Sequence, residues 1–281
     1  MLPAAAALVA ALAVGGGSSG IPAGVVAASA HVEVAVIDTG ADVSVPEIAL
    51  HRPSAYDVRT GTSNVHDLNG HGTFVTSLVA EYGGDARILV VKAGSSSGAF
   101  TDQSESQAIH YAIAHGARIL NLSIGGPSTS TVERAAIRYA VSHGALVVAA
   151  AGNDFQMGNP VEYPAKLVVE TGLVVAASDD GAHAPFSGTA TRVSLAAPGV
   201  DVYGAFGRGR YGRSSGTSFS TAEVSGAAAL VWAANPALTA QQVARILELT
   251  ASGGGTWTPA LGFGVVDVGA AVSRARQLAA R

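Results

Sequence analysis

A serine in a turn of small residues is the first candidate for chemistry. Ser218 follows Gly216 and precedes an apolar run over residues 227–232, which predicts that it lies in the first turn of a buried helix. The unpaired N–H groups of such a turn can stabilise a developing anion. Serine becomes an effective nucleophile only when a base removes its proton. A helix cap is the simpler interpretation of an isolated Gly-Thr-Ser, so the base must come from elsewhere in the chain.

Two further motifs offer a base and an acid that could orient it. His71 stands between two glycines in Gly-His-Gly-Thr, where we expect a loop to enter a helix. Asp38 follows residues 31–37, whose apolar character predicts a buried strand. Histidine can accept a proton near neutral pH, and aspartate can hold its tautomer and stabilise its cation. Asp38, His71 and Ser218 together therefore predict nucleophilic acyl transfer, although each alone fits a turn or a cap.

Asn153 is a fourth candidate, at the end of a predicted strand over residues 145–151. Its amide could donate to an oxyanion together with the backbone N–H of Ser218, and a plain turn residue is the alternative. The remaining histidines have no comparable setting. We expect them to be surface or structural residues: His31, His51, His66, His110, His115, His143 and His183.

Apolar strands alternate with helices of ten or so residues along the chain. This order predicts βαβ units and a mostly parallel, doubly wound sheet of the α/β class, in one domain over residues 24–281. No strand is followed by Gly-x-Gly-x-x-Gly and a later acid, which argues against dinucleotide binding. The other predicted strands are 87–93, 117–123 and 173–177, and the predicted helices are 104–115, 131–142, 226–234 and 239–250.

Composition restricts the partners and the covalent chemistry. The 281 residues carry a net charge of -4 and include no cysteine, so disulfides and thiolate metal sites are excluded. Without a basic surplus we expect no nucleic-acid or membrane partner, and a monomer is the default.

Residues 1–23 form an apolar segment followed by glycine and serine, and the apolar run is too short to span a bilayer. Ala11 and Ala13 fit a signal-peptidase site, which favours a secreted or extracytoplasmic protein. The start of the segment lacks Lys and Arg, so an N-terminal helix or the remnant of a longer segment stays open.

The motifs together resemble those of the subtilisin-like serine peptidases, the subtilases, from about Gly24 to about Ala271. The order Asp, His, Ser is the order in subtilisin. The resemblance implies a three-layer α/β/α fold, with Asp38, His71 and Ser218 as a catalytic triad and Asn153 as an oxyanion donor. The matching segments are residues 35–40, 70–73, 121–126, 149–153, 197–199, 216–218 and 262–267.

The resemblance also implies that an extended peptide or protein segment binds as a strand between two edges. One edge is Ser123, Ile124 and Gly125, and the other is the region of Ser97 and Gly98. Phe100 and Ile124 resemble the walls of a pocket for an apolar residue four before the cut, with plain core packing as the alternative. Glu162 resembles the position at the bottom of the first specificity pocket, where a carboxylate favours Lys or Arg before the cut. A slip of one residue in the matching would instead place Glu162 on the surface.

The chain departs from the family at several positions. Phe74 stands where a second histidine is common, and Ala222 stands where the nucleophile helix usually carries proline. We expect the next residue, Glu223, to interact favourably with the helix dipole. The short segment 81–87 lacks the family's calcium loop, so no cofactor and no tight calcium site are expected even though Glu47 matches a ligand position, and a weaker site elsewhere stays open.

About 30 residues precede the first predicted strand, too few for a folding prodomain. A catalytically incompetent module that binds extended peptides therefore stays open as an alternative to a serine endopeptidase that works through an acyl-enzyme. A peptide ligase or cyclase is a further alternative, because the same residues would serve it.

Overall fold

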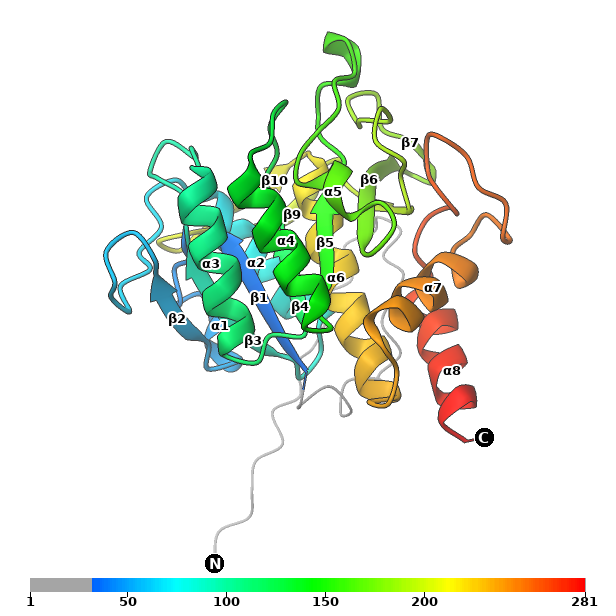
Figure 1. Ribbon diagram of the computed structural model, residues 1–281, viewed down its shortest axis with the longest axis horizontal. Coiled ribbons are helices and arrows are strands. Elements are labelled where there is room, and N and C mark those ends of the chain that lie inside the picture. Colours follow the sequence, from blue (N-terminus) through cyan, green and yellow to red (C-terminus); the bar gives the residue numbers. More distant parts are fainter. Residues whose placement is uncertain (1–31, 281) are drawn as a thin grey trace, which may run out of the picture.

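An eight-stranded sheet forms the centre of the structure, a computed structural model that describes residues 32–280 (Figure 1). The strand order is β2-β3-β1-β4-β5-β6-β7, and β8 also pairs with β6. Only the pairing of β6 with β7 is antiparallel. The predicted mostly parallel sheet is thus confirmed. Its strands are β1 Glu33–Asp38, β2 Ser54–Asp57, β3 Arg87–Lys92, β4 Ile119–Leu122, β5 Leu146–Ala150, β6 Leu173–Asp179, β7 Ala182–His183 and β8 Leu195–Pro198.

Helices cover both faces of this sheet, which makes three layers. Successive residues of a strand point to opposite faces. Accordingly, Val34 and Val36 of β1 join one apolar core, and Ala35 and Ile37 join the other. Figure 1 shows α3 and α4 side by side over the second of these cores. The helices on that face are α3 Asp102–Ala114, α4 Thr131–Ser142 and α5 Ala165–Val168, and those on the opposite face are α2 His71–Tyr82, α6 Thr217–Ala234, α7 Ala240–Thr250 and α8 Val268–Ala279.

Helix α6 is buried along nearly its whole length. Every residue from Thr217 to Ala233 is buried, which fits a helix that is apolar on all sides. The helix begins nine residues earlier than the predicted span 226–234, and Ser218 lies in its first turn as expected. The residue at the start of this helix is therefore held by the core of the protein.

Several elements had no clear signal in the sequence. A hairpin of β9 Val202–Gly207 and β10 Arg210–Ser214 lies outside the main sheet, and helix α8 follows α7. The hairpin contains several glycines, one of which, Gly204, is needed because a Cβ there would lie 2.6 Å from the ring of Phe74. A short helix, α1 Pro46–Leu50, precedes β2.

Among residues 32–280, no helix combines the length and the apolar character that crossing a membrane requires. The segment 1–23, with the signal peptide or remnant expected there, lies outside the described residues.

Candidate functional site

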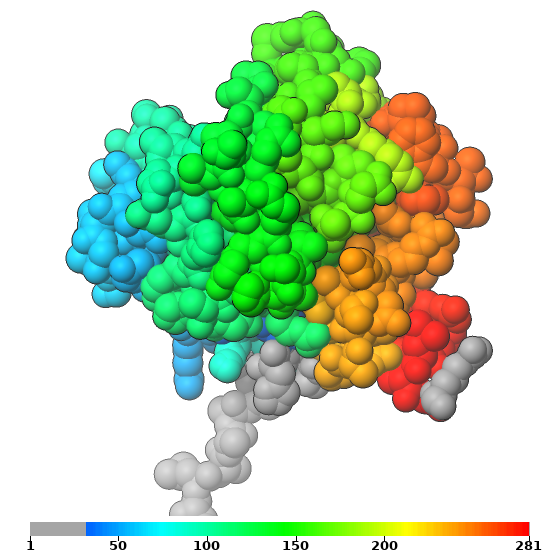
Figure 2. Space-filling model, in the orientation of Figure 1, coloured from blue at the N-terminus to red at the C-terminus, as the bar shows by residue number. Residues whose placement is uncertain are grey.

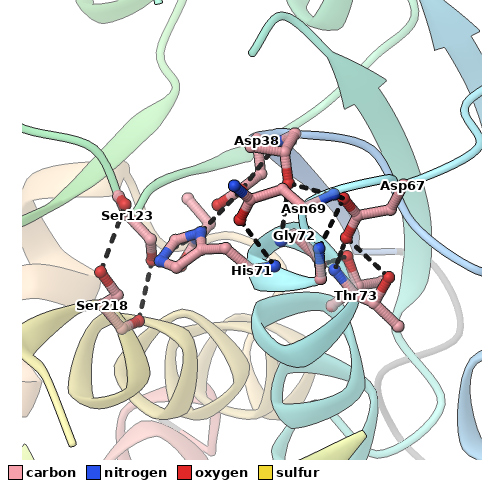
Figure 3. A network of polar contacts seen from close by, with 12 residues as sticks. Asp38, Asp67, Asn69, His71, Gly72, Thr73, Ser123 and Ser218 are labelled. Atoms are coloured by element: carbon pink, nitrogen blue, oxygen red, sulfur yellow. Dashed lines mark hydrogen bonds and ion pairs between the residues drawn. The ribbon is translucent and has the colours of Figure 1, made fainter. Parts of the chain in front are cut away.

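Asp38 and His71 meet where the carboxyl end of β1 faces the start of α2 (Figure 3). Asp38 ends β1 and is 1% exposed; its Oδ1 accepts the N–H of Thr39 at 2.7 Å and lies 2.8 Å from Nδ1 of His71. His71 is the first residue of α2. The next residue, Gly72, must lack a side chain, because a Cβ there would lie 2.2 Å from the carbonyl oxygen of Gly40. Glycine beside the histidine thus permits the close approach that joins imidazole and carboxylate.

Asp67 has no distinctive sequence signal, yet it organises the turn before α2 (Figure 3). Its carboxylate oxygens accept the N–H groups of Asn69, Gly70 and Thr73 and the hydroxyls of Thr39 and Thr73, at 2.7–3.0 Å. Burial alone would raise the pKa of this carboxyl, but the hydrogen bonds, led by that from Gly70, lower it overall. Since Thr39 directly follows β1, the network fixes the start of α2 against that strand.

The imidazole of His71 lies in negative surroundings. Burial alone would lower its pKa, but the charge of Asp38, the hydrogen bond to Asp38 and the charge of Asp67 raise the pKa overall. The side chain is still 31% exposed, and Figure 3 shows the ring between Asp38 and Ser218. An imidazole with a raised proton affinity is suited to accept a proton from a hydroxyl.

Ser218 is the second residue of α6, and hydrogen bonds tie it to the carboxyl end of β4. Its Oγ donates to the carbonyl oxygen of Ser123 at 3.3 Å, and Oγ of Ser123 donates to the carbonyl oxygen of Ser218 at 2.8 Å (Figure 3). Behind this pair, Asn121 of β4 donates to Oγ of Ser123 and accepts from the hydroxyl of Ser225. The position of the hydroxyl beside His71 is therefore set by two buried elements.

Asn153 follows β5 and contacts the residue before Ser218. Its Oδ1 accepts both the N–H and the hydroxyl of Thr217, at 2.9 and 3.0 Å. This fixes the amide with its oxygen toward α6, which leaves the NH₂ group as the donor at the cavity wall. The site thus offers an amide donor beside the helix N-terminus, the arrangement that can bind an oxyanion.

One cavity of about 330 Å³ joins these groups to most of the predicted substrate residues. Ser97 is the exception: it lies in an exposed turn, where its hydroxyl bonds that of Ser95 at 2.8 Å. The predicted site residues that line the cavity are His71, Gly98, Phe100, Ser123, Ile124, Gly125, Asn153, Glu162 and Ser218.

Glu162 is buried in the wall of this cavity, so the one-residue slip that would place it on the surface is excluded. Its side chain fills the space that two glycines leave open: a Cβ on Gly152 would lie 2.4 Å from its Cγ, and one on Gly125 would lie 3.0 Å from its Oε2. Tyr163 and Gly126 exchange two backbone hydrogen bonds, which anchors the segment. Burial, and secondarily the charge of Asp154, raises the pKa of Glu162.

Two departures from the family pattern have structural explanations. Phe74 belongs to the core, where it packs against Phe206 and Phe219 with ring centroids 4.9 and 4.4 Å away. Glu223 is the seventh residue of α6 and 3% exposed. Burial raises its pKa to about 8, with a further contribution from Glu81. The expected interaction with the helix dipole is therefore wrong, because the carboxyl lies beyond the first turn and is largely protonated at neutral pH.

Glu47, which matches a calcium-ligand position of the family, has a protein partner. Glu47 accepts a hydrogen bond from the hydroxyl of Tyr211 at 2.8 Å, and only residues 83–86 connect α2 to β3. Within residues 32–280, no group of three or more His, Cys, Asp or Glu side chains is placed to hold a metal ion.

Comparison with known proteins agrees with this geometry. A family model described as the Subtilase family matches residues 29–264. Subtilisin DY of Bacillus licheniformis is 35% identical over 79% of this chain and 84% of its own length, and Subtilisin E of Bacillus subtilis (strain 168) is 35% identical over 79% and 61%. A solved structure of a cold adapted subtilisin-like serine proteinase superposes with a TM-score of 0.73 at 28% identity, covering 85% of this chain and 89% of the other. The chain belongs to the subtilase family of serine peptidases.

Proposed function

We propose that this protein is a serine endopeptidase that cleaves peptide bonds through an acyl-enzyme on Ser218. The observation that supports this most directly is the set of side chains around one cavity. Asp38 is hydrogen-bonded to His71, and Ser218 lies at the N-terminus of a buried helix. Asn153 lies in the same cavity wall as Ser218, where its amide oxygen accepts a hydrogen bond from Thr217. These groups provide an acid, a base, a nucleophile and an anion donor within one site.

The proposed reaction has two halves. Ser218 Oγ bonds to the substrate carbonyl carbon while its proton passes to Nε2 of His71, and Asn153 with the N–H of Ser218 stabilises the oxyanion. The C–N bond then breaks, and His71 gives that proton to the leaving amine. Water next attacks the acyl group with His71 as base, which releases the acid and restores the hydroxyl. Before the first step, rotation about χ1 must move Oγ from the carbonyl of Ser123 toward His71.

For the substrate we propose an extended segment that pairs with Ser123–Gly125 and with the chain near Gly98. Its side chain directly before the cut enters the space lined by Glu162, where a carboxylate among glycines suits Lys or Arg. A Glu162→Gln variant should therefore lose most of its preference for Lys over Leu at that position. Equal cleavage of both peptides by the unaltered protein would contradict this assignment.

The deciding experiment is the intact mass of the purified protein after treatment with a fluorophosphonate, beside a Ser218→Ala control. We expect one adduct on the unaltered protein and none on the control. Absence of the adduct on a folded sample would favour the peptide-binding module. Product masses with and without an added amine would distinguish hydrolysis from ligation, since only ligation joins the amine to the acyl group.

The remaining expectations are also proposals. We propose that the protein acts as a monomer outside the cytoplasm, without a cofactor or a tightly bound metal. The mass of the chain purified from its native host would show whether the segment 1–23 has been removed, and size-exclusion chromatography with light scattering would give the number of subunits.

A further inference from the structure

Asn69 connects one proposed substrate edge to the rest of the protein. This edge is the turn of residues 95–99, called here the substrate-edge turn. Inside it, the N–H groups of Ser95 and Gly98 donate to carbonyl oxygens of the same turn. The hydrogen bond that links the turn to another segment runs from Nδ2 of Asn69 to the carbonyl oxygen of Ser96, at 3.2 Å. The position of the turn therefore depends on this amide.

The other end of the same amide contacts the backbone of His71 (Figure 3). Oδ1 of Asn69 accepts the N–H of His71 at 3.2 Å. His71 is the first residue of α2, so this N–H has no acceptor within the helix, and the N-cap residue, Gly70, offers no side chain. One neighbour of the amide can only donate and the other can only accept, which fixes the orientation of the amide. A single side chain thus joins the proposed base to the proposed substrate edge.

Asn69 is itself held in place by its surroundings. Its N–H donates to Oδ1 of Asp67 at 2.9 Å, within the network that fixes the start of α2. The substrate-edge turn also passes close to the amide, because a Cβ on Gly98 would lie 3.3 Å from Nδ2 of Asn69. Gly98 has a φ of +84°, a conformation that glycine adopts readily. A displacement of the turn should therefore displace the backbone of His71 as well.

The side chain of Asn69 is exposed, and it lines the cavity together with His71 and Gly98. Figure 2 shows the surface notched between the chain that enters α3, which includes the substrate-edge turn, and the chain that enters α4. A segment bound along the turn would exclude water from the amide, and hydrogen bonds are stronger where water is excluded. Substrate binding should thus stabilise both hydrogen bonds of Asn69.

We propose that Asn69 is a positioning residue, which couples occupancy of the substrate-edge turn to the placement of His71. The inference rests on the proposed peptidase function and deepens it, because it explains how substrate residues remote from the cut would speed the chemical step. A segment paired with the turn fixes Ser96, the amide of Asn69 then fixes the N–H of His71, and the imidazole stays within reach of Ser218. Binding energy from remote residues is thereby used to align the base in the transition state.

The test compares two substrates with the same residue before the cut. The short substrate is acetylated at that residue, and the long one has three more residues, which reach the substrate-edge turn. In an Asn69→Ser variant the hydroxyl still offers an acceptor to the N–H of His71, but it is too short to reach Ser96. We expect kcat for the short substrate to stay within about twofold of the parent value. The gain in kcat on lengthening the substrate should fall about tenfold.

Two further variants separate the roles of the amide. Asn69→Ala removes both hydrogen bonds and should lower kcat for both substrates. Asn64→Ser is the matched control, because Oδ1 of Asn64 accepts the N–H of His66 at 3.1 Å in the same local pattern but does not line the cavity. This control should keep the parent gain. The gain is a ratio within one sample, so a misfolded fraction does not alter it.

Three results would overturn the inference while the cleavage itself supports the peptidase proposal. An equal loss for both substrates in Asn69→Ser would show a purely structural role. A change in KM alone would show a simple substrate contact. An unaltered protein that gains nothing from the longer substrate, or an Asn69→Ser variant that keeps the full gain, would show that no coupling exists. If the unaltered protein cleaves neither substrate, the peptidase proposal fails and the inference fails with it.

Discussion

The buried carboxylate of Asp67 and those of Glu105 and Glu223 differ in the number of hydrogen-bond donors around them. Asp67, 7% exposed, receives five hydrogen bonds from N–H and hydroxyl donors, and its pKa is lowered despite its burial. Glu105 and Glu223 are buried to a similar degree, each has an oxygen without a partner, and the pKa of each is raised to about 8. The number of hydrogen bonds that a buried carboxylate receives, more than its degree of burial, therefore decides whether it keeps its charge.

The difference matches what each region does in the fold. The turn around Asp67 must hold the first turn of α2 rigidly so that His71 meets Asp38, and a charged acceptor with several donors does this well. The unsatisfied glutamates fix no such turn. Because each has an oxygen without a donor and a raised pKa, their protonation can change with the pH of the solvent or with the binding of a ligand.

The largest effect should come from removing the negative charge that faces His71. Asp38→Asn keeps the shape of the side chain but changes its hydrogen bonding to Nδ1 of the imidazole. We expect kcat to fall by about 10⁴-fold, as in triad enzymes generally. The acidic limb of the pH profile should also move to lower pH, because Asp38 raises the pKa of His71. A loss below tenfold with an unmoved limb would show that Asp38 does not orient the base.

Next in size is the loss of the acceptor in the turn before α2. Asp67→Ala leaves several buried donors unsatisfied and should lower the free energy of unfolding by about 3–5 kcal/mol. Asp67→Asn, which retains one acceptor oxygen, should cost less. Because the folded-state pKa is lowered, the carboxylate stabilises the fold above its unfolded pKa of about 3.9 and loses this effect as pH falls through the folded value. Urea denaturation between pH 7 and pH 3 would measure the cost of each substitution and its dependence on pH. Equal stability of the parent protein and both variants at pH 7 would contradict the stabilising role of Asp67.

A smaller effect of opposite sign is expected at Glu223. Its pKa is about 8 in the folded protein and about 4.3 when unfolded, so ionisation opposes folding increasingly as pH rises between these values. Glu223→Gln should therefore increase the free energy of unfolding by about 1–3 kcal/mol at pH 8 and change it little near pH 4. Chemical denaturation at the two pH values provides the measurement. A variant that is less stable than the parent at pH 8 would mean that the carboxylate has a partner in solution.

The smallest effect should come from a carboxylate in solvent. Arg213 and Asp201 form an ion pair at 3.2 Å with side chains 53% and 68% exposed. Arg213→Ala should change the free energy of unfolding by less than about 0.5 kcal/mol, and by less still at high salt. A loss above 1 kcal/mol in the same denaturation assay would show that exposed pairs in this protein behave like buried ones.

Residues in strongly patterned segments could be predicted from the sequence, and residues fixed by tertiary contacts could not. Apolar strands that lead to Asp38, Ser123 and Asn153 indicated the sheet and the site, because the ends of parallel strands meet at one edge. Asp67 gave no signal, since an aspartate two residues before Asn-Gly is ordinary in any turn.

The unsatisfied glutamates were equally hidden. Glu105 and Glu133 stand in first turns of helices, where acids are common and usually exposed, and only the packing of α3 on α4 buries them. The hairpin of β9 and β10 was missed because its glycines and charges break the alternation that marks a strand.

The proposed site draws its acid from β1 and its nucleophile from α6, which lie far apart in the described chain. While the protein is being synthesised, no chain that has emerged only as far as β8 contains Ser218, however well its earlier strands have formed. If Ser218 is the nucleophile, cleavage activity can therefore begin only after the whole central sheet has been translated. Products of premature termination before α6 would not cleave the ribosome or neighbouring nascent chains. The order of the elements along the chain would thus delay proteolysis until the fold is nearly complete.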